Sequence, residues 1–331
     1  MKVLISGGAG FIGSTIANAC RDRGISTVIL DDCSTGDPSF AEGHPFYMGD
    51  IADGDLIDQI MQHHPDVGVV VHCAAKVIVP ESVENPLDYY ETNVSKSLAF
   101  LRHLTRNGVS RLVFSSSASV YASTNRGVVD EGSAIRPSSP YAVTKAVFER
   151  VLEDSANANI LRAIALRYFN PIGADPLLRS GVQHPDPPHA LGLLIKCASE
   201  KGSAFTIAGT DWPTRDGSAI RDYVHVWDLA EAHVSAIQRF DSIVRQDVPF
   251  HVINIGTGTG VTVRELVDAV GRVTGAQLKV LEGTRRLGDS TGASADGTRA
   301  KELLEWEPIL SLDDAVIHAM AWADRRRQPR M

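Results

Sequence analysis

A tyrosine and a lysine four residues apart, Tyr141 and Lys145, form the most reactive combination in this sequence. On a helix these positions share one face, with Cβ atoms about 6 Å apart. A free tyrosine titrates near pH ~10, but a nearby cation favours the phenolate and lowers its pKa. We therefore predict that Lys145 lowers the pKa of Tyr141, and that the Ser117 hydroxyl bridges Tyr141 and a substrate oxygen. This proton-handling device needs a partner that can accept a hydride.

The helix that carries the pair has clear start signals. Ser139 and Pro140 lie directly before Tyr141, and the sequence predicts a helix over 141–155. Taken alone, a Tyr and a Lys at this spacing also fit an ordinary surface pair. Two observations favour a catalytic role for the pair: a serine-rich strand end precedes it, and the N-terminus carries a dinucleotide-binding fingerprint.

That fingerprint lies in the first 30 residues. The sequence predicts a strand at 2–6, a glycine-rich loop at 7–13, a helix at 14–23 and a second strand at 27–30. The Gly-x-Gly-x-x-Gly spacing of the loop allows a tight turn and close approach of a pyrophosphate. The free N–H groups at the start of the helix then favour the phosphates.

An acidic pair follows the second predicted strand. Asp31 comes 18 positions after Gly13, where a carboxylate can accept hydrogen bonds from the adenosine ribose hydroxyls. Asp32 stands where a protein that binds a 2′-phosphate would need Arg or Lys. The sequence therefore predicts NAD as the cofactor in preference to NADP.

Strands and helices alternate through the first half of the chain, which predicts an α/β fold with a doubly wound parallel, Rossmann-type sheet. We predict an NAD-binding domain over 1–172, rejoined by about 219–256, and a smaller C-terminal α/β substrate domain over 173–331. Within the smaller domain, residues 206–221 resemble a hairpin. Residues 252–255 are expected to return to the main sheet.

Composition limits the possible partners. Of the 331 residues, 22% are charged and the net charge is −8, which argues against nucleic acid as a partner. The four cysteines show no metal or disulfide spacing, so we expect no metal site and a cytoplasmic protein. No apolar stretch is long enough to span a membrane, and we expect no membrane partner.

Several further motifs continue the pattern along most of the chain: Gly49-Asp50-Ile51, Ala74-Ala75-Lys76, Ser115 to Tyr121, Arg167 to Gly173, Arg221 to Val226, and Arg285 to Asp289. With the fingerprint and the Tyr-Lys pair, they resemble the extended short-chain dehydrogenase/reductase superfamily, and within it the UDP-glucose 4-epimerases. The resemblance implies tightly held NAD, a nucleotide-sugar substrate of the UDP-hexose type and a homodimer.

The resemblance also assigns roles to individual residues. It implies Tyr141, Lys145 and Ser117 as catalytic residues. It implies these cofactor contacts: Gly7, Gly10, Phe11, Ile12, Gly13, Asp31, Asp32, Ser34, Asp50, Ile51, Ala74, Ala75, Lys76, Asn93, Tyr141, Lys145 and Phe169. It implies these substrate contacts: Ser117, Asn170, Arg221, Arg286 and Asp289. From its position inside a helix, Asn93 fits a cofactor contact and an ordinary polar surface residue equally well.

The residues after Ser117 separate related activities. Dehydratases and decarboxylases of this superfamily need a carboxylate in this motif, and here the positions are Ala118 and Ser119. That leaves oxidation at C4 of a nucleotide sugar and its reversal, which is epimerisation through a 4-keto intermediate. Two alternatives stay open: a reductase or an enzyme of the same fold with another nucleotide, and a non-catalytic NAD-binding regulator.

Three positions depart from the family pattern. Ala190 replaces the usual Asn, Ala208 replaces an aromatic ring that stacks on uracil, and Ala293 replaces a bulky Tyr near the sugar. The first two leave the nucleotide open. A small residue at 293 leaves room for a C2 acetamido group, so we also expect activity on the N-acetylhexosamine forms.

Overall fold

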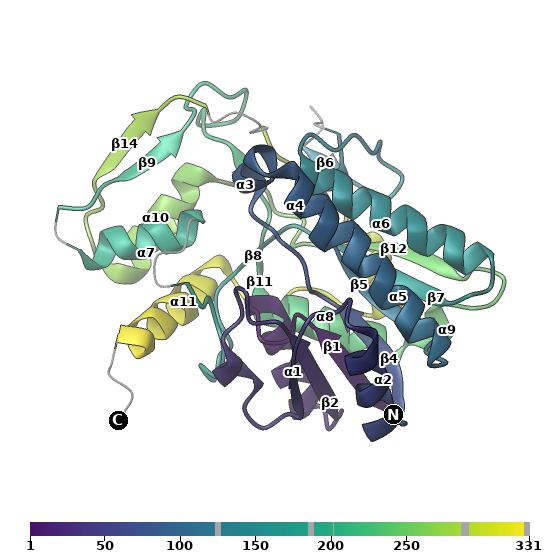
Figure 1. Cartoon of the computed structure of the whole chain (residues 1–331). Coiled ribbons are helices and arrows are strands. Elements are labelled where there is room, and N and C mark those ends of the chain that lie inside the picture. The colour runs from purple at the N-terminus through teal and green to yellow at the C-terminus, as the bar shows by residue number, and fades with distance from the viewer. Residues whose placement is uncertain (123–126, 185–188, 201, 286–290, 328–331) are drawn as a thin grey trace.

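A seven-stranded parallel sheet forms the centre of the molecule (Figure 1). The computed structural model describes residues 1–122, 127–184, 189–200, 202–285 and 291–327. The strands, in their order across the sheet, are β12 (Phe250–Ile255), β7 (Arg162–Tyr168), β5 (Arg111–Ser117), β4 (Val67–His72), β1 (Lys2–Ser6), β2 (Thr27–Asp31) and β3 (Phe46–Met48). Every neighbouring pair is parallel. The predicted doubly wound sheet is confirmed.

Helices cover both faces of this sheet, which explains why its strands are almost wholly apolar. On one face lie α1 (Phe11–Asp22) and α8 (Val226–Gln238), and on the other α2 (Gly54–His63), α5 (Ser97–Arg106) and α6 (Pro140–Asn157). Successive side chains of β1 point to opposite faces of the sheet. Val3 and Ile5 pack on the side of α1 and α8, and Leu4 packs on the side of α2, α5 and α6.

A smaller unit lies beside the sheet, at the upper left in Figure 1. It contains α7 (Ala190–Ser199), α10 (Val263–Thr274), α11 (Leu312–Arg327) and the parallel pair β9 (Phe205–Ala208) and β14 (Val280–Gly283). Its helices and strands share a second apolar core that includes Leu191, Leu194, Phe205, Leu266 and Val316.

The hairpin predicted over 206–221 is wrong. β9 pairs in parallel with β14, and β10 (Ile220–Arg221) pairs instead with β13 (Val261–Thr262). The Pro- and Gly-containing stretch between β9 and β10 does turn, with the Trp212 N–H donating to Gly217 O at 2.9 Å. The strands on either side separate because each finds its partner far along the chain, which local turn chemistry does not encode.

The chain crosses between the two cores more than once. β8 (Asn170–Ile172) pairs with β11 (Tyr223–His225), and β12 returns to the main sheet beside β7, as expected. Ala300, Leu304 and Trp306 pack in the core of the main sheet, whereas α11 packs in the smaller one. The division at residue 172 remains a prediction.

The remaining elements are short. They are η1 (Pro38–Ala41), α3 (Val79–Glu84), α4 (Pro86–Tyr90), the π-helical turn η2 (Glu91–Lys96), η3 (Ala118–Val120), α9 (Phe240–Ile243), the π-helical turn η4 (Ala300–Leu304), and the paired strands β6 (Val128–Val129) and β15 (Ser294–Ala295). None of the described helices is long and apolar enough to cross a bilayer.

Candidate active site

Strand order reverses between β1 and β4, and in such sheets ligands bind in the crevice beyond the carboxyl ends of the strands. The loops after these strands touch. Gly7 has a φ of +73°, and a Cβ there would lie 2.6 Å from the backbone nitrogen of Ala74. A Cβ on Gly13 would lie 2.2 Å from Gly7 O. The glycine spacing is therefore required by the packing of α1 on its own loop.

The start of α1 fits a pyrophosphate. Its N-cap is Gly10, and no side chain in the described part of the chain caps the first turn, which holds Phe11 and Ile12. The first N–H groups and the positive end of the helix dipole are thus left for an anion. Among the described atoms, a Cβ on Gly10 would meet only Gly7 O within 4 Å, at 3.3 Å.

The acidic pair after β2 organises two turns. Asp31 is buried and accepts hydrogen bonds from the N–H groups of Ala9 and Cys33, at 2.9 and 2.8 Å. Burial raises the pKa of Asp31, although these two bonds oppose the shift. Asp32 is exposed and accepts from both the N–H and the hydroxyl of Ser34. Asp31 therefore links the strand end to the glycine loop, and Asp32 shapes the turn outside it.

An ion pair that the sequence did not predict, between Asp50 and Lys96, lies just after the end of β3. Asp50, next to the buried Ile51, forms an ion pair with Lys96 at 2.5 Å. Bonding to Lys96 and Ala52 lowers the pKa of Asp50 even though burial opposes it. Lys96 was missed because nothing in the sequence relates the π-helical turn to the end of β3.

Asn93 is buried, so its interpretation as an ordinary surface residue is wrong. Its side-chain oxygen accepts from the Lys76 N–H at 2.8 Å, and its amide group donates to Lys76 O and to the Thr144 hydroxyl. The Lys76 ammonium group lies 3.7 Å from Glu81 and 3.5 Å from Asp88. Asn93 therefore braces the loop containing Ala74 and Ala75 against α6, and its contact with a cofactor remains a prediction.

The fold brings Tyr141, Lys145 and Ser117 together. Tyr141 lies in the first turn of α6, which Ser139 caps by accepting from the Ala142 N–H at 3.2 Å. The Ser117 side chain at the end of β5 lies near the Tyr141 hydroxyl and lowers its pKa. Lys145 is 4% exposed, and its Nζ lies 5.9 Å from the centre of the Tyr141 ring.

Burial is the largest influence on the pKa values of Tyr141 and Lys145. Burial raises the pKa of Tyr141, and the Ser117 hydrogen bond offsets this only in part. Burial also lowers the pKa of Lys145 to about 8. The Lys145 ammonium group donates to Ser115 O at 2.8 Å, and its effect on the pKa of Tyr141 remains a prediction.

Of the residues predicted to contact the diphosphate and sugar, Asn170 and Arg221 are among the described residues. Asn170 has an exposed side chain, and the Arg221 guanidinium donates to Ile220 O at 2.7 Å. Arg286 and Asp289 lie outside the described residues. Ala293 and the half-buried Phe169 pack against one cluster of buried side chains, formed by Val120, Tyr121 and Val129. Residue 293 therefore lies beside the loop that follows Ser117.

Asp222 is a central residue that sequence reasoning missed. It is fully buried and accepts from the N–H and hydroxyl of Thr257, the N–H of Gly258 and the N–H of Ala295, at 2.6 to 3.0 Å. It thereby ties the end of β12 to the strand that follows Ala293. The only signal for it in the sequence is its position next to Arg221.

We expect Asp222→Asn to lower stability by about 1–3 kcal/mol, because an amide N–H₂ group would replace one accepting oxygen and face N–H or O–H donors, the buried Ala295 N–H among the possible ones. Denaturant unfolding of the purified protein measures the change. Asp211→Asn is the matched control, because that side chain is exposed and its loss is expected to cost less than ~1 kcal/mol. Equal stability of the two variants would contradict this account of Asp222.

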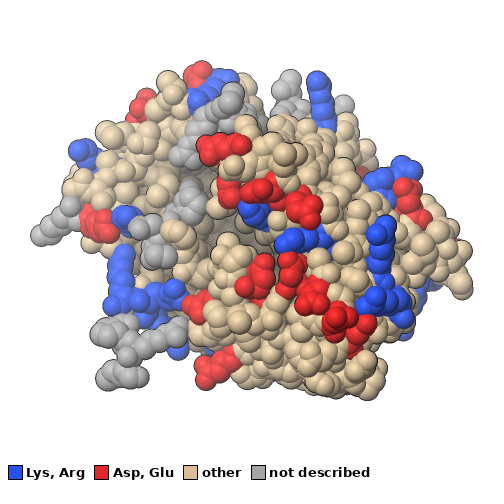
Figure 2. Space-filling model, viewed as in Figure 1, with Lys and Arg blue, Asp and Glu red and all other residues tan. Residues whose placement is uncertain are grey.

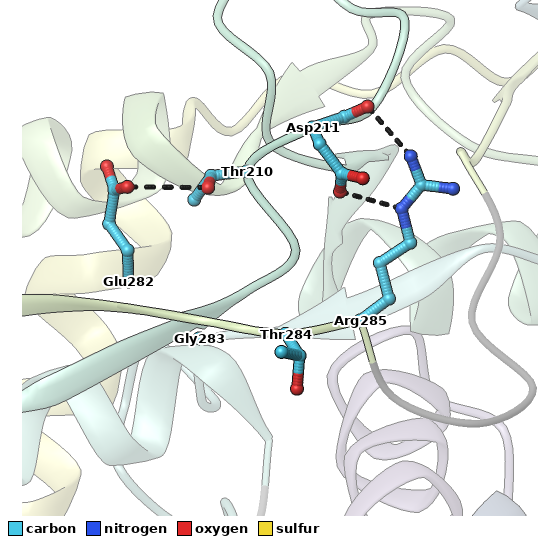
Figure 3. Close-up of a pocket in the computed structure, with 6 residues that line it drawn as sticks. All are labelled: Thr210, Asp211, Glu282, Gly283, Thr284 and Arg285. Atoms are coloured by element: carbon cyan, nitrogen blue, oxygen red, sulfur yellow. Dashed lines mark hydrogen bonds and ion pairs between the residues drawn. The ribbon is translucent and has the colours of Figure 1, made fainter.

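A separate cavity of about 480 Å³ opens between the ends of β9 and β14 (Figure 3). Asp211 and Arg285 point toward each other across it, with Nε to Oδ1 at 2.7 Å. The Arg285 guanidinium also stacks on the Trp212 ring at 3.9 Å. Ala208, the last residue of β9, pairs with Gly283 at the edge of this cavity. On the face in Figure 2, carboxylates surround a central hollow, with basic groups between them.

Residues 3–256 match the family model described as "NAD dependent epimerase/dehydratase family". The chain belongs to this family. Among curated members, it is 38% identical to the UDP-glucose 4-epimerase of Azospirillum brasilense over 97% of this chain and 91% of the relative. It is 36% identical to that of Rhizobium meliloti over 99% and 98% of the two chains.

Solved structures of family members agree. The UDP-glucose 4-epimerase of Stenotrophomonas maltophila, crystallised with NAD and formylated UDP-arabinopyranose, superposes with a TM-score of 0.93 at 34% identity and 98% coverage of both chains. The UDP-Glc/GlcNAc 4-epimerase of Campylobacter jejuni gives 0.82 at 31% identity, covering 98% of this chain and 99% of that one.

Proposed function

We propose that this protein is an isomerase that interconverts the C4 epimers of a nucleotide sugar, UDP-galactose and UDP-glucose, with NAD as its resident cofactor. One observation carries the proposal: Tyr141, Ser117 and Lys145 assemble at the same edge of the sheet as the uncapped start of α1. A proton-transfer group and a dinucleotide cradle thus meet in one crevice. Family membership and relatives that are 4-epimerases support the same activity.

The residues present fit NAD. In our proposal the loop from Gly7 to Gly13 and the first turn of α1 hold the pyrophosphate, and Asp31 and Asp32 hold the adenosine ribose. The absence of a basic residue at these two positions disfavours a 2′-phosphate. When bound, NAD supplies the acceptor and donor of the hydride and a positive nicotinamide ring.

The chain's own residues handle the proton. We propose that the Tyr141 oxygen takes the proton of the C4 hydroxyl while Ser117 holds that hydroxyl in line. Burial raises the pKa of Tyr141, so the phenolate needs the Lys145 ammonium together with the cationic ring. The 4-keto sugar then presents its other face, and Tyr141 returns the proton.

Incubating the purified protein with UDP-galactose, without added cofactor, tests the proposal. We expect UDP-glucose to accumulate to equilibrium with no net change in NADH absorbance. Steady consumption of added NADH would identify a reductase. Absence of any turnover in protein that retains NAD would favour a non-catalytic regulator.

We place the nucleotide base near the cavity between β9 and β14, because Ala208 and Arg285 border it. In this proposal the Arg285 guanidinium over the Trp212 ring offers a surface for a base in place of the aromatic ring absent at position 208. Asn170, Arg221, Arg286 and Asp289 are our proposed contacts to the sugar and diphosphate.

The sugar specificity depends on residue 293 in our proposal. Ala293 packs beside Phe169 and the loop after Ser117, and its single methyl group leaves space for a C2 acetamido group. The relative from Campylobacter jejuni, a UDP-Glc/GlcNAc 4-epimerase, shows that the family includes enzymes for both sugar types.

We expect Ala293→Tyr to reduce kcat/KM for UDP-N-acetylglucosamine at least ~10-fold relative to UDP-glucose, since a phenol ring would occupy the space of the acetamido group. Competing-substrate assays on both sugars measure the ratio. Ala293→Ser adds little volume and is the matched control. An unchanged ratio in the tyrosine variant would refute this role.

We also propose that the protein is a cytoplasmic homodimer. The four cysteines, all within the described ranges, are free thiols, as expected in a reducing compartment. The dimer follows from the resemblance to the epimerases, and sedimentation equilibrium tests it directly.

A further inference from the structure

A buried ion pair lies beside the Tyr141 and Lys145 face of α6. Glu149 is one helical turn beyond Lys145, and its carboxylate accepts from Arg167 on β7 through Nε at 2.9 Å and Nη2 at 2.5 Å. The two side chains are only 8% and 7% exposed. Burying two charges is costly, and it is tolerated only with good geometry and further hydrogen bonds.

Those further bonds are present. Arg167 donates through Nη1 to the Tyr121 hydroxyl at 3.0 Å and stacks over its ring at 4.9 Å. The same hydroxyl donates to the side-chain oxygen of Asn254 at 2.6 Å. Four elements, α6, β7, β12 and the loop after β5, thus meet at one charged network.

Glu149 reaches the proposed catalytic group in two ways. The Ser116 hydroxyl donates to Glu149, and Ser116 directly precedes Ser117 on β5. Glu149 and Lys145 are four residues apart on one helical face. Burial lowers the pKa of Lys145, and the Glu149 charge acts in the opposite direction.

We propose that Glu149 is a positioning residue for the epimerase reaction, fixing the strand end at Ser117 through Ser116 and supplying a fixed negative charge to the buried Lys145 ammonium. The inference rests on the proposed function, in which Lys145 acts as a cation. The other titratable groups around Lys145 are Tyr141 on its own helix and His72 and Cys73 at the end of β4.

The neutral variant Glu149→Gln tests the charge. Losing a negative charge lowers the pKa of Lys145 further, so Lys145 gives up its proton at lower pH. We therefore expect the alkaline limb of the kcat–pH profile to move down by roughly one to two pH units, as for a unit charge about 6 Å away at an effective dielectric constant near 20. Glu149→Asp keeps the charge and is expected to restore the limb.

Two further variants separate charge from packing. Tyr121→Phe removes a hydroxyl from the same network but keeps Glu149 and Arg167, so we expect lower thermal stability with the limb unmoved. If Glu149→Gln fails to fold, Glu149→Gln/Arg167→Met leaves no unpaired buried charge. It should show a smaller downward shift, because loss of the more distant Arg167 cation offsets part of the effect. The proposal would be overturned if the alkaline limb of the kcat–pH profile stayed in place in Glu149→Gln and in the double variant. It would also be overturned if Tyr121→Phe moved the limb as far as Glu149→Gln does.

A titration without turnover keeps this inference distinct from the proposed function. The ultraviolet absorbance of the phenolate is followed in NAD-loaded protein, with Tyr141→Phe as the blank. We expect Tyr141 to ionise at higher pH in Glu149→Gln than in the parent protein, because the neighbouring lysine is neutral over more of the range. Identical titrations would refute the role of Glu149 even if the protein proves not to be an epimerase.

Discussion

Tyr141→Phe is expected to lower kcat on UDP-galactose by at least ~10²-fold, and up to ~10⁴-fold, while NAD stays bound. The substitution removes one oxygen, the atom that in our proposal carries the proton of the C4 hydroxyl. The ring itself is 9% exposed and packed at the start of α6, so its shape and most of its packing are kept. The loss should therefore appear in turnover and not in cofactor content.

Steady-state kinetics and the NAD content of denatured protein measure the two parts of this prediction. Tyr47→Phe is the matched control, since Tyr47 lies on β3 at the far edge of the sheet and bonds only to the side chains of His63 and His64 within the described structure. A Tyr141→Phe enzyme with near-normal kcat would remove Tyr141 from the chemistry.

Gly13→Ala is expected to abolish retention of NAD and to lower stability by about 3 kcal/mol, at the upper end of the usual cost of overpacking. A Cβ at this position would lie 2.2 Å from Gly7 O and 2.8 Å from Gly8 Cα, and neither backbone atom can rotate away. Either α1 shifts away from its loop or the loop leaves the end of β1. Both movements displace the N–H groups that we propose hold the pyrophosphate.

Denaturant unfolding and equilibrium dialysis with NAD measure these effects. Gly271→Ala, inside α10, is the control. Outside the backbone of that helix, the nearest described atom to a Cβ at this position is Ala276 O, at an ordinary contact distance of 3.5 Å. There, replacing glycine in a helix should stabilise the protein by about 0.5–1 kcal/mol. Full NAD content in Gly13→Ala would mean that the loop tolerates the displacement and that our account of the cradle is wrong.

The parts of the fold that local chemistry encodes could be predicted from the sequence. The first strand, loop and helix follow from glycine spacing and an apolar run, and the structure has them within a few residues of the predicted bounds. The meeting of Tyr141 and Lys145 follows from helical periodicity. That Ser117 joins them follows from strand ends sharing one edge of a parallel sheet.

The rest depends on contacts between distant segments. β9 pairs with β14, 75 positions later, so its neighbours in sequence suggested a hairpin that does not exist. Asp222 and Glu149 each look like any other acid in the sequence, and their partners lie on other elements. The pKa of Tyr141 could not be predicted from spacing, because desolvation, which only the packed structure determines, raises it more than Ser117 lowers it.

The repeated crossing of the chain between its two cores limits how new specificities can be engineered. A single cut near residue 172 would strip the main sheet of its edge strand β12 and of α8. The smaller core would lose none of its own helices, yet Ile172 and Tyr223 would be divided between fragments. Exchanging the whole smaller core for that of a relative therefore requires replacing at least three separate stretches together: those that hold α7 and β9, α10 and β14, and α11.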